Sequence, residues 1–251
     1  ADLEGTSGGT SGSSSDYRGI FRGDGADSLE QVVREGDPSP DGFTFTQFVS
    51  PTQNDAGQIA FIGISGSERG IFRSDTTNNH VQIQRNGDGI PGGGGRFIRA
   101  GDPVMNEAGQ VVFRYIAEGG TGMFLGDESG LERIVHSGQL APDGIGVFTG
   151  GFQNEYDFNN AGQVAFIAST SDINGNSLRG LHLYDDQLGI TQVARVGEAL
   201  LGSTIAYLSI DPNNGRGRNS LNDLGQVAYL FTLEDGRAGI AIATVVPEPS
   251  G

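Results

Sequence analysis

The chain has 251 residues with a formal net charge of −16, and it contains 43 glycines and no cysteine. All of its 15 Lys or Arg residues are arginine, so chemistry that needs a thiolate, a Schiff-base lysine, a zinc–thiolate site or a P-loop lysine is excluded. The negative charge repels phosphate backbones and anionic membranes, so nucleic acid is not an expected partner. A hydrophobic fraction of 35% suffices for a core, and the excess of glycine favours turn-rich all-β structure.

The first 18 residues precede the first full repeat of the chain. Ala1–Glu4 resembles a segment near the end of the chain that begins at Phe231, and Gly5–Asp16 is a run of Gly, Ser and Thr that ends in Asp. The sequence begins without Met and without a signal peptide, which indicates a processed or truncated product. We predict that residues 1–18 are a partial repeat remnant followed by a flexible surface loop.

A pattern of Asn-x-x-Gly-Gln followed by an apolar run occurs four times, with its glycines 52, 53 and 63 residues apart. The four copies are Asn54–Gly57, Asn106–Gly109, Asn159–Gly162 and Asn222–Gly225. Asparagine at the first position of a turn can bond to its own backbone, and glycine is favoured at the fourth. Each copy is therefore predicted to be a tight turn between two strands, C before the turn and D after it.

Two further strands recur in step with this turn. Strand A starts with Gly and apolar residues, and strand B ends in Arg-x-Gly-acid or a variant of it. Strand D is apolar at successive positions, which indicates that it packs between two layers. Aromatic residues recur in strand D (Phe61, Phe113, Phe166 and Tyr229) and in strand A (Phe21, Phe72 and Phe124), and we expect them in the core.

A four-stranded unit of ~50 residues is typical of a β-propeller blade. We predict a single all-β, propeller-like repeat domain over residues 19–246, with an open stack of small antiparallel sheets as the alternative. The four repeats are placed at about 19–68, 69–121, 122–178 and 179–236, with a terminal strand at 239–246.

Two polar patterns are candidates for function. Asp172, Asn174 and Asn176 have the alternating oxygen spacing with which a calcium loop begins, but the closing bidentate glutamate is missing, so a metal-free turn is the alternative. No other cofactor is expected, because the three histidines are spread over different repeats. The pairs Arg34–Asp37, Arg85–Asp88 and Arg195–Glu198 could line a ligand channel, but positions repeated in every unit favour turns and ion pairs between units.

The last predicted strand, Gly239–Val246, is of type A and is followed by no B, C or D strand. A strand without a neighbour exposes a row of N–H and C=O groups, which proteins cover or use for association. The strand can pair within the chain and close a ring, or it can add to a sheet of a neighbouring copy and build a homo-oligomer or filament. The same apolar run is far shorter than the ~20 residues of a membrane helix, so no membrane insertion is expected of this sequence.

The Asn-x-x-Gly-x-x-Ala-Phe turns are accompanied by Arg-x-Gly-Asp-x-x-Pro-x-Gly-like segments, at Arg34–Gly42 and, as a variant, His136–Gly144. Over about residues 17–246 the chain thereby resembles the tandem-repeat NxxGxxAF-containing surface proteins of bacteria. Val246–Ser250, with the sequence Val-Pro-Glu-Pro-Ser, resembles the start of a PEP-CTERM sorting signal, so residues 247–251 are interpreted as the start of such a tail. The apolar helix and arginine cluster of the full signal do not follow Ser250.

This resemblance implies export by a Gram-negative-type bacterium, processing by an exosortase-like membrane enzyme, and a link to exopolysaccharide or biofilm matrix. The family supplies no catalytic motif to carry over. We therefore expect a non-catalytic structural or binding protein, extracellular or on the cell surface, with matrix polysaccharide or copies of itself as partners. The alternative is a carbohydrate-active or glycan-binding propeller, because paired carboxylates can hydrolyse glycans.

Overall fold

The computed structural model describes residues 18–23, 29–76, 79–211 and 220–244, which form 20 β-strands. The predicted remnant and loop in residues 1–17 and the tail at 247–251 lie outside the described residues. No helix of the described part is long and apolar enough to cross a membrane.

The strands form five antiparallel sheets that follow one another along the chain. The first sheet contains β1 (Gly19–Arg22) and β2 (Glu30–Arg34). The second contains β3 (Gln47–Gln53), β4 (Ile59–Ser65), β5 (Glu68–Thr76) and β6 (Asn79–Arg85). The third contains β7 (Phe97–Ala100), β8 (Val104–Met105), β9 (Val111–Ala117), β10 (Gly120–Asp127) and β11 (Gly130–His136). The fourth contains β12 (Phe148–Gly150), β13 (Tyr156–Phe158), β14 (Val164–Ser171), β15 (Ser177–Asp185) and β16 (Gly189–Arg195). The fifth contains β17 (Ala199–Leu200), β18 (Ser203–Ser209), β19 (Gln226–Leu233) and β20 (Ala238–Thr244).

The middle sheets arrange their strands in the order C, D, A, B, so each sheet joins strands C and D of one sequence repeat to strands A and B of the next. In the third and fourth sheets strand C is split in two, and both pieces pair with strand D. In the described residues the first sheet has only an A and a B strand, and the fifth ends at its A strand, β20. The all-β prediction is confirmed.

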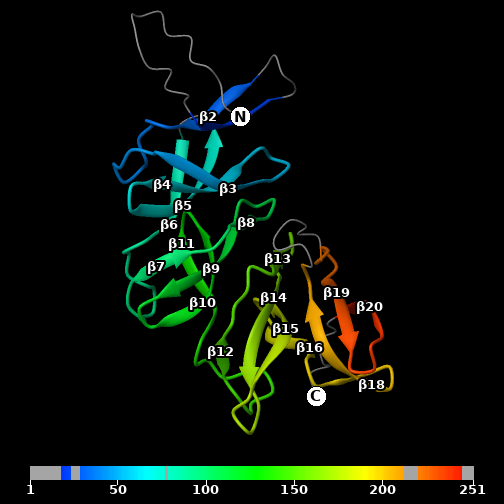
Figure 1. The fold of residues 1–251 in the computed structure, drawn as a ribbon. Coiled ribbons are helices and arrows are strands. Elements are labelled where there is room, and N and C mark those ends of the chain that lie inside the picture. The colour runs from blue at the N-terminus through cyan, green and yellow to red at the C-terminus, as the bar shows by residue number, and fades with distance from the viewer. Residues whose placement is uncertain (1–17, 24–28, 77–78, 212–219, 245–251) are drawn as a thin grey trace, which may run out of the picture.

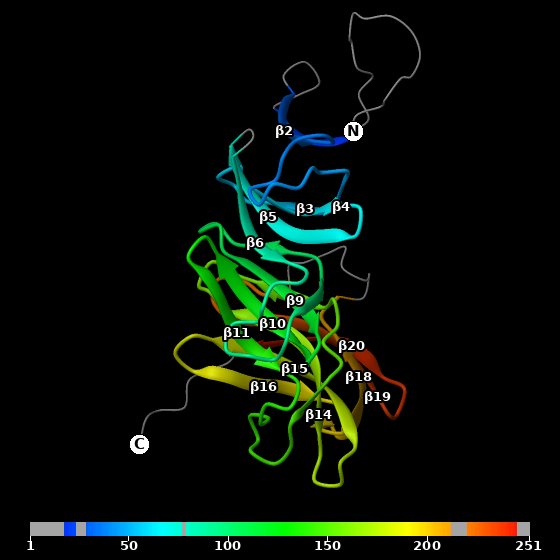
Figure 2. The same cartoon turned by 90° about the vertical axis from the view of Figure 1, so that its left-hand side faces the viewer.

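The sheets form an open array that runs from β2 at one end to β18–β20 at the other (Figure 1). Figure 2 shows the array after a quarter turn, with the second and third sheets between β2 and β20 and the fourth sheet overlapping the fifth. Among the described residues no strand pairing joins the first sheet to the fifth. The described sheets form an open stack of small antiparallel sheets, which was the alternative prediction, and the predicted propeller-like ring is not found among them.

The core consists of apolar layers between successive sheets. Ile62 and Ile71 of the second sheet, for example, pack in one cluster with Phe113 and Phe124 of the third. Similar clusters lie between the third and fourth sheets and between the fourth and fifth. Because β4 has a sheet on each side, five consecutive residues from Ile59 to Gly63 are buried, as a strand that is apolar on both faces requires.

The recurring aromatic residues face each other across strands D and A. Phe61 pairs with Phe72, Phe113 with Phe124, and Phe166 with His182, which stands where the other two sheets have phenylalanine. All six side chains are fully buried, and each pair is stacked with ring centres 5.4–6.2 Å apart. The predicted core is therefore confirmed, except that Phe21 of the short first sheet is only half-buried.

Candidate functional site

The four Asn-x-x-Gly turns have the same internal hydrogen bonds. In the first, the Asn54 Oδ1 accepts from the Gln58 N–H at 2.9 Å, and the Asn54 Nδ2 donates to the Gln58 Oε1 at 2.7 Å. The N–H of Gly57 donates to the Asn54 carbonyl at 3.1 Å. All four turn glycines have φ between +73° and +82°, a conformation that glycine adopts without the strain of a side chain. The turns join strand C to strand D as predicted.

Hydrogen bonds also join each turn to the next, and we call this series the turn ladder. The Asn54 Nδ2 donates to the carbonyl of Asn106 at 3.2 Å, and the Asn159 Nδ2 donates to the carbonyl of Asn222 at 2.8 Å. In addition, the backbone N–H of the second residue in each turn donates to a side-chain oxygen of the second residue in the next. These bonds are Asp55 to Glu107 at 2.9 Å, Glu107 to Asn160 at 2.9 Å, and Asn160 to Asp223 at 2.9 Å.

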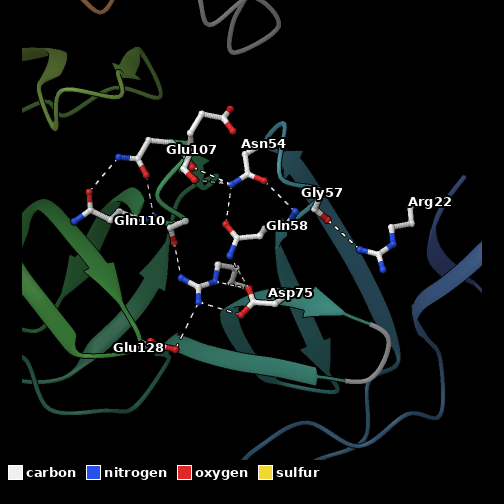
Figure 3. Close-up of polar contacts among 11 residues, drawn as sticks. Arg22, Asn54, Gly57, Gln58, Asp75, Glu107, Gln110 and Glu128 are labelled. Carbon is white, nitrogen blue, oxygen red and sulfur yellow. Dashed lines mark hydrogen bonds and ion pairs between the residues drawn. The ribbon is translucent and has the colours of Figure 1, made fainter. Parts of the chain in front are cut away.

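Figure 3 shows the junction between the first two turns. Arg73, at the end of the Gly-Ile-Phe-Arg segment of β5, is buried and donates from Nη1 to the carbonyl of Gly109 at 2.7 Å. Its Nε donates to Asp75 at 2.8 Å, and the Gln58 side chain donates to the same carboxylate. Arg22 occupies the equivalent place in β1 and donates to the carbonyl of Gly57 at 3.3 Å. The ladder therefore sets the spacing between sheets.

The asparagine and glycine of each turn were predicted from the sequence, but the inter-sheet contact of the second turn position was not. The sequence does contain a pattern that indicates this contact: the second residue of every turn carries a side-chain oxygen. These residues are Asp55, Glu107, Asn160 and Asp223. Strand C of the second sheet is also irregular four residues before the turn, which the sequence pattern did not predict. There Ser50, at φ +54°, donates from Oγ to the Asp102 carboxylate of the next sheet at 2.5 Å.

A cleft of about 280 Å³ is lined by Arg114, Gln153, Asn154 and Glu155. Arg114 of β9 donates from Nη1 to the carbonyl of Phe152 at 3.0 Å, which holds the guanidinium at the cleft. The Glu155 carboxylate accepts from Arg179 at 2.5 Å and from the Ser209 hydroxyl at 2.6 Å. Among the described residues that line this cleft, the Glu155 carboxylate is thus already paired, and the amides of Gln153 and Asn154 are exposed.

The predicted calcium residues lie in the turn between β14 and β15. The Asp172 Oδ1 accepts from the N–H groups of Asn174 and Asn176, both at 2.8 Å, and Oδ2 accepts from the Asn176 Nδ2 at 2.9 Å. These hydrogen bonds, led by that of the Asn176 side chain, lower the pKa of Asp172. The carboxylate therefore closes its own turn. No group of three or more His, Asp or Glu side chains in the described part of the chain is arranged to hold a metal ion.

The Arg-x-Gly-acid segments stabilise turns and join neighbouring units. Asp37 accepts from the N–H of Arg34 at 2.8 Å, and Glu198 accepts from the N–H of Arg195 at 2.9 Å. The Arg195 guanidinium donates to the carboxylate of Asp143 in the preceding connection at 2.9 Å, as Arg85 does to Asp41 at 2.6 Å. This is the local interpretation that the sequence favoured over a ligand channel.

Two of the three histidines, His80 and His182, likewise serve the packing. His182 is fully buried between Phe148 and Phe166, with ring centres 5.0 and 5.4 Å away. Burial, and next the positive charge of Arg195, lowers the pKa of His182 to about 4, so the imidazole is neutral at pH 7. His80 lies edge-on to Phe45 and Phe61, and burial lowers its pKa as well.

A family model described as a family of unknown function (DUF7453) matches residues 3–251, and the chain therefore belongs to this family. No curated protein and no solved structure matches the chain.

Proposed function

We propose that this protein is a non-catalytic structural repeat protein of an extracellular matrix, displayed or released by a Gram-negative-type bacterium, and that its copies associate through their terminal strands. The observation that carries the proposal is the uncovered apolar face of the fifth sheet. On β20, Ile240 and Ile242 are 71% and 70% exposed and lie on the same face of the strand.

This face differs from the equivalent face of the inner sheets. Ile71 of β5 occupies the place of Ile240 in its own sheet, directly after the strand-A glycine, and is fully buried against the third sheet. Stacked repeats need a polar outer face on the terminal unit if they are to remain separate in water. A terminal sheet with two large exposed isoleucines supports association, because burying them removes apolar surface from water.

Ring closure within one chain, as in a propeller, is the competing use of this strand. It requires the fifth sheet to meet the first, and both views place these sheets at different ends of the array (Figures 1 and 2). Association between copies requires no such movement of the middle sheets. A contact between unlike ends that does not close on itself gives a filament, which suits a matrix component.

Binding of matrix polysaccharide is a second candidate function, favoured by the cleft at Arg114. Exposed amides and a guanidinium are groups that bond to sugar hydroxyls and carboxylates. Tyr207, 49% exposed with the Arg179 guanidinium 5.2 Å from its ring centre, offers an aromatic surface on the neighbouring β18. Affinity electrophoresis in gels containing alginate or dextran tests this function, with retardation expected for the wild type and lost in Arg114→Ala.

Sedimentation velocity over a wide concentration range tests the association. We expect the mean mass of the wild type to rise with concentration and Ile242→Asp to remain a folded monomer. Ile173→Asp is the matched control, since Ile173 is 82% exposed in the β14–β15 turn, away from the ends of the array. A wild type that stays monomeric at all concentrations, or a loss of assembly in the control as well, contradicts the proposal.

A further inference from the structure

The two ends of the turn ladder carry complementary groups. Each turn donates from the N–H of its second residue to a side-chain oxygen in the turn that follows it. At the start of the ladder the Asp55 carboxylate accepts no such bond from a described residue. At the far end the N–H of Asp223 has no acceptor in the described part of the chain, and Asn222 is exposed, whereas Asn54, Asn106 and Asn159 are each only 4% exposed.

In the second and fourth turns, the glycine is contacted by a glutamine side chain from the preceding turn. The first turn has no such contact from a described residue. A Cβ atom added to Gly109 would meet the Gln58 side chain at 2.6 Å, and one added to Gly225 would meet the Gln163 side chain at 3.0 Å. Each of these glutamines comes from the preceding turn. Gly162, which follows the turn of Gln110, has nothing within 4 Å, so the glutamine packs on two of the three turns that follow another turn. At Gly57 the nearest atom is in the Arg22 side chain, 3.7 Å away.

A cleft of about 380 Å³ lies at this place. It is lined by Arg22 and Glu30 from the first sheet and by Gln53, Asp55 and Gly57 from the second. In every other sheet that precedes a turn of the ladder, the corresponding space holds the C–D turn of that sheet. The first sheet has no C or D strand in the described residues, so no described Asn-x-x-Gly turn lies at the place of this cleft.

The strands of the two end sheets match in the same way. In four sheets the glycine of strand A lies opposite a fixed position of strand B, as Gly19 does opposite Arg34 and Gly70 opposite Arg85. Gly239 of β20 has no such partner among the described residues, since β20 is the last strand of its sheet. Ile20, which follows Gly19, packs against the core of the second sheet, and Ile240 holds the equivalent place in β20.

Building on the association proposed above, we propose that β18–β20 of one copy complete the first sheet of the next copy. The turn Asn222–Gly225 enters the cleft, where the Asp223 N–H donates to Asp55 and Gln226 packs on Gly57. β20 takes the place of the four-residue β1, so that Arg22 leaves the cleft and Ile242 holds its position, and β20 pairs with β2 with Gly239 opposite Arg34. This gives a sheet in the order C, D, A, B, and Ile240 and Ile242 pack on the second sheet of the receiving copy.

The partner is a second copy because the contact needs groups from both ends of the chain, and the three middle sheets separate these ends within one molecule (Figures 1 and 2). The same contact between copies would cover the apolar face of the fifth sheet and fill the cleft at the first turn. The mode is heterologous, so each added copy presents the same free end again.

Disulfide trapping tests the contact, since the chain contains no cysteine of its own. In the variant Asp55→Cys/Asp223→Cys, mild oxidation should give a ladder of covalent multimers on a denaturing gel. The matched control is Asp55→Cys/Glu107→Cys, which joins two positions that are neighbours within one chain and should give a cross-linked monomer.

Three results overturn the proposal. A cross-linked monomer of the 55/223 variant would show that the two ends meet within one chain. Absence of its cross-link, in a sample that assembles and in which the 55/107 pair does cross-link, would refute this contact while leaving association through another surface intact. Cross-linking between cysteines at Ile20 and Ile242 in place of 55/223 would show that β20 adds beside β1 and does not replace it. If the wild type does not assemble at all, the association proposed above fails first.

Discussion

The third and fourth turns of the ladder have nearly the same sequence and different surroundings. Asn159 is 4% exposed and donates to the carbonyl of Asn222 at 2.8 Å. Asn222 has the same hydrogen bonds within its own turn but is exposed, because no described turn follows it. The motif itself builds the turn, whereas burial comes from the next sheet. An Asn-x-x-Gly turn is thus both a local structure and one half of a contact between sheets.

The largest loss of stability is expected when a strand-A phenylalanine is removed from an inner sheet, and the same substitution in an end sheet should cost less. Phe124 and Phe21 hold the same place in strand A, but Phe124 is fully buried and Phe21 only half-buried. Phe124→Ala should lower the free energy of unfolding by about 3–5 kcal/mol, because a large cavity remains in a layer with sheets on both sides. Phe21→Ala should cost clearly less. Urea denaturation measures both, and equal losses would contradict the description of the first sheet as an open end.

A second prediction concerns the pH dependence of stability that arises from His182, which is stacked on Phe166 in the fourth sheet. The pKa of His182 is about 4 in the folded protein and near 6.5 when unfolded, because burial disfavours the imidazolium. Between these values the unfolded chain binds a proton that the folded chain does not. The free energy of unfolding should therefore fall as pH drops from 6.5 to 4, by up to about 3 kcal/mol, and the His182 contribution should level off below 4.

His182→Phe is the test of this assignment, since Phe72 and Phe124 stand at the same position in the second and third sheets. The variant should keep the stacking on Phe166 and show a much weaker dependence on pH in denaturation experiments between pH 4 and 7. A smaller slope of the same sign should remain, because burial also lowers the pKa of His80. An unchanged pH profile would show that His182 is not the group that titrates.

The turn ladder itself should respond differently at its middle and at its end. Asn159→Ala removes the buried cap of its own turn together with the hydrogen bond to the Asn222 carbonyl of the next turn, which should cost about 1–3 kcal/mol. Asn222→Ala removes only bonds within its own exposed turn and should cost about 0.5–1 kcal/mol in the monomer. Thermal unfolding at a concentration below that of assembly compares the two. A larger loss for Asn222→Ala would show that the ladder bonds contribute little.

These comparisons also show what the sequence could and could not predict. The four turns and the buried aromatic residues of strands D and A, except Phe21, follow from local pattern, and the structure confirms them. The stacking of turn on turn depends on residues 52 to 63 positions apart, such as Asp55 with Glu107. Local periodicity carries no information on such contacts. The same holds for the Arg114 cleft, where Glu155 and Ser209 meet from different sheets.

A fourth prediction separates the cost of backbone strain from that of a crowded contact. Gly57→Ala places a side chain at φ +79° with its nearest neighbour at 3.7 Å, so the loss should be about 1 kcal/mol from the left-handed backbone alone. Gly109→Ala has the same strain at φ +76°, and its Cβ would in addition stand 2.6 Å from the Gln58 side chain. Gly109→Ala should therefore be the more destabilising variant in urea denaturation, and equal losses would show that Gln58 moves aside freely.

The smallest effect is expected at the β14–β15 turn, which has no sheet stacked against it and whose candidate ligands are exposed. The calcium hypothesis predicts that millimolar calcium raises the melting temperature of the wild type and not that of Asp172→Asn. The hydrogen bonds favour the other outcome, since both Asp172 oxygens already accept N–H groups of Asn174 or Asn176, and a calcium ion would have to replace these donors. We therefore expect Asp172→Asn to lower the melting temperature by less than Asn222→Ala does, by the same amount with calcium or with EGTA. A calcium-dependent rise in the wild type alone would reverse this expectation and show that the exposed turn opens to take an ion.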